Sequence, residues 1–96
     1  MKHLIVEVVE VRGNCVAKYN VGDKIEINQN VCIEGNKICY FALSSIMPAI
    51  LALQLGNEPK DIGLSKEKGV SYMQCSDPGG FLTPGATVVF KIKDKF

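Results

Sequence analysis

One segment of the chain constrains the fold more than any other, a long apolar stretch from Tyr40 or Phe41 to Leu55. Only Ser44, Ser45 and Gln54 mark a polar side of the helix that this stretch predicts. Its apolar side chains cover most of the circumference: Leu43, Ile46, Met47, Ile50, Leu51, Leu53 and Leu55. A helix that is apolar nearly all round is either covered by a sheet or used for association. We therefore expect a sheet on one side of the helix and a second copy of the protein on another.

Proline and glycine set the limits of this predicted helix. Pro48 removes one backbone donor and clashes with the preceding turn, which predicts a kink near Ser44 and Ser45. The alternative is that a short first turn ends at Met47 and Pro48 begins the main helix at its first position. Gly56 follows the last apolar residue and suits the left-handed conformation that ends many helices.

The rest of the chain reads mainly as strands. Residues 2–11 alternate, with Leu4, Val6 and Val8 on one face, and residues 24–28, 70–74 and 86–93 show similar patterns. Residues 31–33 are either a further short strand or an extended arm. Polar turns are expected at residues 21–24 and 28–30, and Gly35-Asn36 is a hairpin signal.

One helix placed among strands predicts an α+β fold with two layers, a main helix packed on a small and mostly antiparallel sheet. The sheet could curl toward a small barrel, and the alternative is a closed barrel with the helix as plug or lid. A chain of 96 residues forms a single domain, residues 1–96. Its hydrophobic fraction of 47% is enough for a core.

Charge and patterning exclude several classes of partner. Eleven basic and ten acidic residues give a net charge of +1, and there is one arginine, so we expect no nucleic-acid binding. Glu7 and Glu10 interrupt the apolar start of the chain, which argues against a secretory signal. The apolar helix lies between strands and predicts a buried element, with no membrane association. We therefore expect a soluble cytoplasmic protein whose thiols are reduced.

Three of the four cysteines lie where a predicted element meets a turn. Cys15 follows Gly13-Asn14, Cys39 opens the helix, and Cys75 ends a strand. Loop ends held by rigid elements often carry functional groups, so the three thiols form a cluster if their turns meet at one end of the domain. The sequence leaves that convergence open.

Three interpretations of these cysteines remain. Cys15, Cys39 and Cys75 are candidate metal or cluster ligands, although the paired Cys-x2-4-Cys spacing of structural zinc sites is missing. Cys39 is also a candidate catalytic or redox thiol, because a helix N-terminus favours thiolate. The third interpretation is that the thiols only pack in the core, as free cysteines commonly do. No cofactor is identified by any motif.

Other ionisable groups add little chemistry. His3 is the only histidine, and its position near the start of an edge-like strand predicts a solvated or packing side chain. Asp77 and Asp23 stand in turns and are expected to accept hydrogen bonds from backbone N–H groups.

Short motifs spread over almost the whole chain support a family resemblance. They are Gly13-x-Cys15, Val21-Gly22-Asp23, Cys39-x-x-Ala42-Leu43 with Pro48 and Leu53, Cys75-x-Asp77-Pro78, and Val89-Phe90-Lys91-Ile92. In their order and spacing the chain resembles a family of small cysteine-containing proteins found largely in anaerobic bacteria and archaea. No activity is established for that family, so the resemblance implies no substrate or cofactor.

The chain departs from the family pattern at several positions. Members often carry proline after the second and third shared cysteines, where this chain has Tyr40 and Ser76. Many carry histidine roughly where this chain has Tyr19, so if that histidine is a fourth ligand in other members, this chain has lost it or never used it. Cys32 matches no position of the pattern.

Two functional hypotheses follow. The first is a small soluble binding or accessory module that forms a homo-oligomer, and for which a small-molecule ligand is unknown. The alternative is a metal- or cluster-binding or thiol-redox protein that uses Cys15, Cys39 and Cys75. Whether the protein is an enzyme is left open by the sequence.

Overall fold

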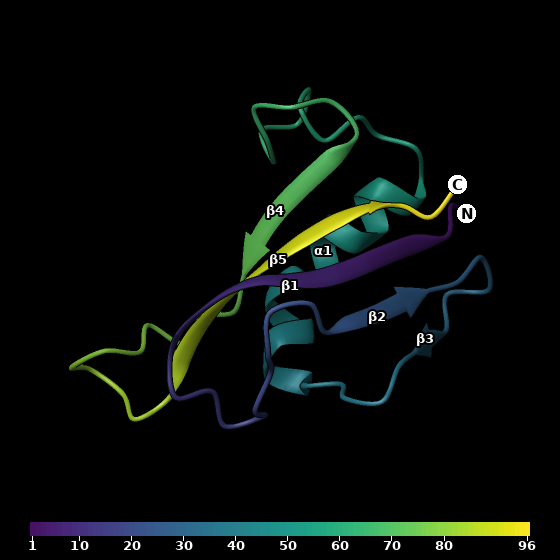
Figure 1. Cartoon of the computed structure of the whole chain (residues 1–96). Helices are drawn as coiled ribbons and strands as arrows, with labels where there is room; N and C mark the ends of the chain where they lie inside the picture. Colours follow the sequence, from purple (N-terminus) through teal and green to yellow (C-terminus); the bar gives the residue numbers. More distant parts are fainter.

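A five-stranded sheet and one helix make up the fold (Figure 1). The computed structural model describes all 96 residues. In chain order the elements are β1 (Leu4–Gly13), β2 (Lys24–Ile27), β3 (Ile33–Glu34), α1 (Tyr40–Gln54), β4 (Val70–Gln74) and β5 (Ala86–Asp94). The strands lie in the order β3-β2-β1-β5-β4, and every neighbouring pair is antiparallel. The first and last strands therefore pair at the centre of the sheet.

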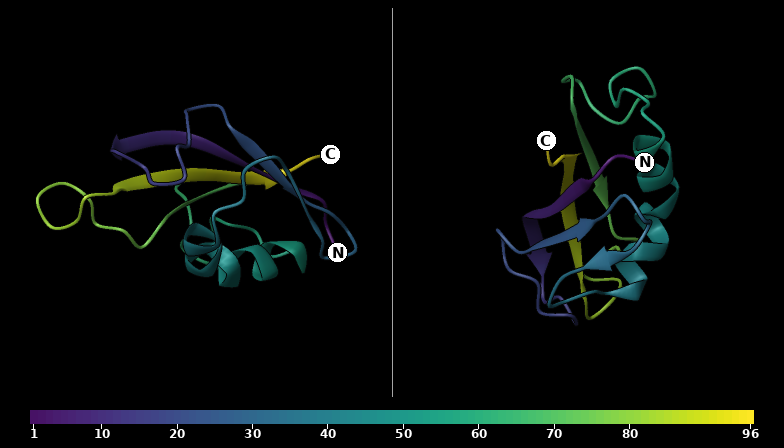
Figure 2. Two further views of the ribbon diagram at one scale, coloured as in Figure 1. Left: turned by 90° about the horizontal axis from the view of Figure 1, so that it is seen from below. Right: turned by 90° about the vertical axis from the view of Figure 1, so that its right-hand side faces the viewer.

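The molecule has two layers. Figure 2 shows α1 against one face of the sheet, while no element covers the other face. The predicted α+β class is confirmed. The sheet is open, with β3 at one edge and β4 at the other, so the alternative of a closed barrel with the helix as plug or lid is wrong. With only two residues, β3 is too short to close a sheet of five strands.

A β-bulge in β1 keeps a charge out of the core. The pairing with β5 shifts register between Val8 and Glu10, so Val9 is the extra residue. Before the bulge, alternate residues from Leu4 to Val8 face α1 and are buried. Without the shift, strict alternation would next turn Glu10 inward. The bulge instead leaves Glu10 exposed and packs Val11 against the core.

The hydrophobic core lies between α1 and the inner face of the sheet. Burying one such aliphatic side chain contributes about 1.5–3 kcal/mol. The completely enclosed aliphatic side chains are Leu4, Val6, Val8, Ile46, Val88 and Ile92. No helix of the structure combines the length and the apolar character needed to cross a bilayer.

One continuous helix contains Pro48. Because α1 begins at Tyr40, the interpretation in which Pro48 starts the main helix is wrong. The C-terminal end confirms the predicted glycine cap. Gly56 has a φ of 97°, its N–H donates to the Leu53 carbonyl (3.0 Å), and the Asn57 N–H donates to the Ala52 carbonyl (3.3 Å). This pair of bonds is a Schellman motif, which satisfies carbonyls that the helix itself leaves free.

Gln54 does not mark a polar side of α1, as the sequence had indicated, because the residue is buried. The side-chain amide of Gln54 donates to the backbone carbonyls of Lys2 (3.2 Å) and Asn28 (3.0 Å). The backbone carbonyl of Gln54 accepts the Lys2 N–H (3.0 Å). These bonds join the end of α1 to the start of β1 and to the β2–β3 turn. Buried amides are stable only when paired in this way.

Candidate functional site

An apolar pocket opens at the N-terminal end of α1. It lies between that end of the helix, the loop after β1 and the segments where β4 ends and β5 begins. Its volume is about 460 Å³, and twelve of its thirteen lining residues are hydrophobic. This volume is within the range of small-molecule sites, which are mostly apolar with few polar groups. Cys15, Cys39 and Cys75 all line it.

Cys39 is the N-cap residue of α1, directly before Tyr40. Its backbone is extended (φ −86°, ψ 114°), and its side chain makes no capping hydrogen bond to the helix. Its thiol is partly exposed and packs at the margin of the core. The first turn of the helix contains no acidic residue, so no carboxylate competes with the sulfur for the free N–H groups.

Cys75 is a buried thiol with its hydrogen bonds made. The Val88 N–H donates to its Sγ (3.3 Å), and the thiol donates to the Ala86 carbonyl oxygen (3.4 Å). Its own N–H donates to the Val88 carbonyl (3.0 Å). Cys75 therefore extends the contact between the end of β4 and the start of β5.

The other two cysteines differ from each other. Cys15 is partly exposed, in the loop after β1, where its carbonyl accepts the Lys18 N–H (2.9 Å). Cys32 is exposed in the turn between β2 and β3 and does not line the pocket. Its Sγ lies 3.5 Å from the Asn30 carbonyl oxygen. None of the four cysteines forms a disulfide.

Tyr19 fixes one wall of the pocket. Its hydroxyl accepts the Cys39 N–H (3.0 Å) and donates to the Lys37 carbonyl (3.1 Å). Its ring meets Phe90 edge-to-face, with 5.7 Å between ring centroids. Burial raises the pKa of Tyr19 above its usual value of 10.0, against the opposing effect of the Cys39 N–H bond. The neutral phenol thus holds the loop after β1 against the beginning of α1.

Asp77 is the one charged residue that lines the pocket, and it supports the loop between β4 and β5. Its carboxylate accepts hydrogen bonds from the Gly79 N–H (2.9 Å) and from the Thr83 hydroxyl. Its carbonyl accepts the Thr87 hydroxyl (2.7 Å). These bonds confirm the predicted turn role of Asp77.

The apolar lining of the pocket favours binding of an apolar molecule.

Metal-ligating side chains gather elsewhere in the fold. The chain contains one group of three His, Cys, Asp or Glu side chains whose ligand atoms all lie within 4.8 Å of one another, and it consists of His3, Glu26 and Glu34. The sulfurs of Cys15, Cys39 and Cys75 therefore do not all lie within 4.8 Å of one another. A metal site at these cysteines stays a prediction.

His3 lies beside the central strand β1, and not at an edge as its sequence position had indicated. Its Nε2 is 3.3 Å from Glu26 Oε2, and its ring meets Phe96 edge-to-face. His3 lines a different pocket from the three cysteines, so the structure does not bring a histidine to these thiols.

Comparison with known proteins adds no assignment. No protein-family model, no curated protein and no solved structure matches this chain. The resemblance to cysteine-containing proteins of anaerobes therefore stays a prediction.

Two features of the structure were not predicted from the sequence. Tyr19 was noted only as the replacement of a family histidine, although its position four residues after Cys15 could have placed it in the same loop. The proximity of Glu26 and Glu34 depends on the pairing of β2 with β3, and a strand of two residues gives too short a sequence pattern to predict that pairing.

Proposed function

We propose that this protein is a binding module that takes a small apolar molecule in the pocket at the N-terminal end of α1. The observation that carries this proposal is a cavity of about 460 Å³ whose lining includes a single charged side chain. Apolar surface lining such a cavity favours transfer of an apolar ligand from water. The Tyr19 hydroxyl and the Cys75 thiol, which belong to residues of the lining, already have hydrogen-bond partners in the protein.

A titration with toluene tests the pocket. We expect amide and methyl NMR signals of Ala17, Ala42 and Ala86 to shift, since all three residues line the cavity. Ala17→Phe places a ring in the cavity and is expected to abolish the shifts. Val21→Phe is the matched control, because Val21 is exposed and does not line this cavity. Shifts of equal size in wild type and Ala17→Phe would refute the pocket as the binding site.

Self-association is the second part of the proposal. The exposed side of α1 carries Tyr40, Phe41, Met47, Leu51 and Leu55, and the helix contains no charged residue. Large exposed apolar patches mark interaction sites, and a face without charge suits the same face of a second copy. A stable dimer buries about 1,200–2,000 Å² in total, so loops beside α1 would also take part.

Light scattering on purified protein tests this association. We expect a dimer for wild type and a monomer for Leu51→Glu, because the new carboxylate would lie between the two helices. Val21→Glu is the control, since Val21 is also an exposed apolar residue but is not part of α1. A monomer for wild type at working concentration would end the claim of a dimer.

A metal- or cluster-binding or thiol-redox function is the second candidate, favoured by the fact that Cys15, Cys39 and Cys75 line one pocket. Metal analysis of protein purified anaerobically would find about one equivalent per chain if these thiols hold an ion. Thiol titration with a chromogenic reagent tests activation of Cys39. Because Cys32 is exposed and reacts in any case, the measurement belongs in a Cys32→Ser background. One fast thiol there, lost in Cys39→Ser, would support thiol chemistry, and uniformly slow thiols would exclude it.

A further inference from the structure

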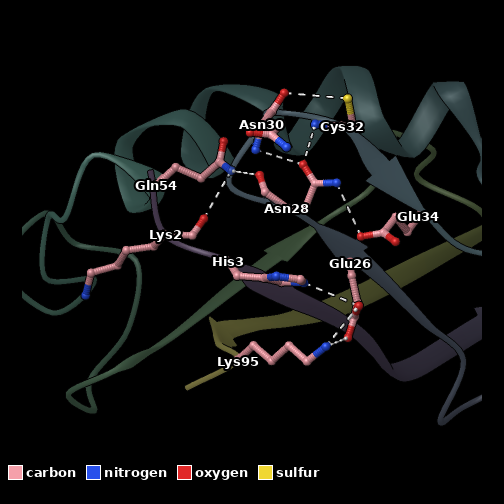
Figure 3. A network of polar contacts seen from close by, with 9 residues as sticks. All are labelled: Lys2, His3, Glu26, Asn28, Asn30, Cys32, Glu34, Gln54 and Lys95. Atoms are coloured by element: carbon pink, nitrogen blue, oxygen red, sulfur yellow. Dashed lines mark hydrogen bonds and ion pairs between the residues drawn. The ribbon is translucent and has the colours of Figure 1, made fainter.

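The face of the sheet opposite α1 carries a second cluster of functional groups, formed by His3, Glu26 and Glu34. They come from the segment entering β1, from β2 and from β3, and Figure 3 shows the His3 ring pointing toward Glu26. One ligand atom from each residue lies within 4.8 Å of the other two. His3 Nε2 and Glu26 Oε2 are 3.3 Å apart.

We propose that His3, Glu26 and Glu34 bind one divalent transition-metal ion, with zinc the best fit to the donors. Zinc accepts imidazole nitrogen and carboxylate oxygen as ligands, and a site with three protein ligands keeps a water molecule in the fourth position. Zinc bonds of 2.0–2.2 Å at tetrahedral angles separate the ligand atoms by about 3.3–3.5 Å. The His3–Glu26 pair already has this separation, and a carboxylate oxygen of Glu34 lies within 4.8 Å of the ligand atoms of both.

The charge distribution favours a cation at this place. Glu26 and Glu34 are directly opposite in the β2–β3 pairing, where like charges destabilise a sheet. Glu34 receives only the Asn28 side-chain amide (3.3 Å), which does not neutralise it. A divalent ion would offset both carboxylates together.

His3 is held ready for such a bond. Its side chain is only 10% exposed, and the Phe96 ring meets it edge-to-face with centroids 5.9 Å apart. A ligand whose ring orientation is fixed in advance loses little entropy on binding. An ordinary surface histidine has no such restraint.

Lys95 is the cation that now occupies part of this site. Its Nζ lies 3.1 Å from Glu26 Oε1, so the ion must compete with this ammonium for the carboxylate. Removal of the Lys95 charge should therefore strengthen metal binding. Most substitutions that remove a contact at a binding site weaken binding, so a gain in metal affinity on removal of the Lys95 charge would be a distinctive result.

Binding would join three segments of the sheet. β3 is paired to β2 only through Glu34 with Glu26 and Ile33 with Ile27. A metal ion held by β1, β2 and β3 segments would fasten this short edge strand, and the folded state would gain stability with metal concentration.

Titration with Co²⁺ tests the proposal on the full chain, because its visible absorption reports the ligands. We expect one ion per chain, with bands of nitrogen and oxygen ligation and no intense sulfur-to-cobalt charge transfer. His3→Gln and Glu34→Gln should each weaken binding by at least about tenfold, the loss that even outer-shell substitutions produce. Lys95→Met should strengthen it severalfold. At a given Co²⁺ concentration the melting temperature should rise more for wild type than for Glu34→Gln.

Glu7→Gln is the matched control. Like Glu34→Gln it removes one negative charge from the face of the sheet opposite α1, but Glu7 lies outside the cluster. Equal weakening in this control would show a general effect of surface charge and overturn the site. A sulfur charge-transfer band with unchanged affinity in His3→Gln would place the ion at the cysteines and also overturn it. So would failure of both wild type and Lys95→Met to bind Co²⁺.

Discussion

The hydroxyl of Tyr19 offers the sharpest test of how the pocket is held together. Tyr19→Phe removes one oxygen and leaves the ring, and with it the edge-to-face contact with Phe90, in place. Two backbone groups then lose their partner, the Cys39 N–H at 3.0 Å and the Lys37 carbonyl at 3.1 Å. Each such bond contributes a net of about 0.5–1.5 kcal/mol, so the two together contribute about 1–3 kcal/mol.

The expected loss is near the middle of this range, about 2 kcal/mol. For a domain of this length, about 1 kcal/mol shifts the melting temperature by 4–8 °C, so we expect a decrease of roughly 8–16 °C. Urea unfolding followed by circular dichroism measures the free energy directly. Hydrogen exchange of the Cys39 amide should also become faster, which locates the effect at the beginning of α1.

Tyr40→Phe is the control for this measurement. It deletes the same atom from a tyrosine that is 85% exposed and has no hydrogen-bond partner, so its effect should stay within about 0.5 kcal/mol. The reasoning is refuted if the two variants have equal stabilities, or if the Cys39 amide exchanges at the wild-type rate in Tyr19→Phe.

Three further predictions concern stability. Ser71 is completely buried and its Oγ has no hydrogen-bond partner, so Ser71→Ala should raise the unfolding free energy by about 1 kcal/mol in urea titration; a loss would show that the hydroxyl is satisfied. Val31 has a φ of 56°, so Val31→Gly should stabilise by about 0.5–1 kcal/mol in the same assay, whereas Val21→Gly should destabilise. The Gly69 N–H holds the pKa of Glu58 below its usual value of 4.5, and this stabilisation is present above that pH and lost as the pH falls through the lowered pKa. The melting temperatures of wild type and Glu58→Gln should therefore converge on acidification, and a gap that is constant with pH would contradict this.

The helix and the strands were predictable because their signals are local. The apolar run of α1 is long, and Gly56, which has no Cβ, adopts the left-handed conformation of the cap without strain. Gln54 was misassigned because the residues that need its amide, Lys2 and Asn28, are distant in sequence. Gly35-Asn36 was expected to form a hairpin, but the hairpin turn between β2 and β3 precedes it and Gly35 leads into the helix instead.

The site was less predictable than the fold, since it depends on which turns meet in space. The sequence placed Cys15, Cys39 and Cys75 at element boundaries but left their convergence open. The shared pocket arises because β1 and β5 pair over nearly their whole length, which brings the loop after β1 next to Ala86. No spacing of cysteines along the chain encodes that pairing.

The central pairing of β1 with β5 also decides when this domain can fold during translation. Leu4 pairs with Asp94, so the middle of the sheet is missing until almost the whole domain has left the ribosome. Until then β1 exposes a long unpaired edge that can join another nascent chain. A chaperone that holds the amino-terminal segment, or a pause in synthesis before β5, should therefore affect the yield of native protein more than any event near α1.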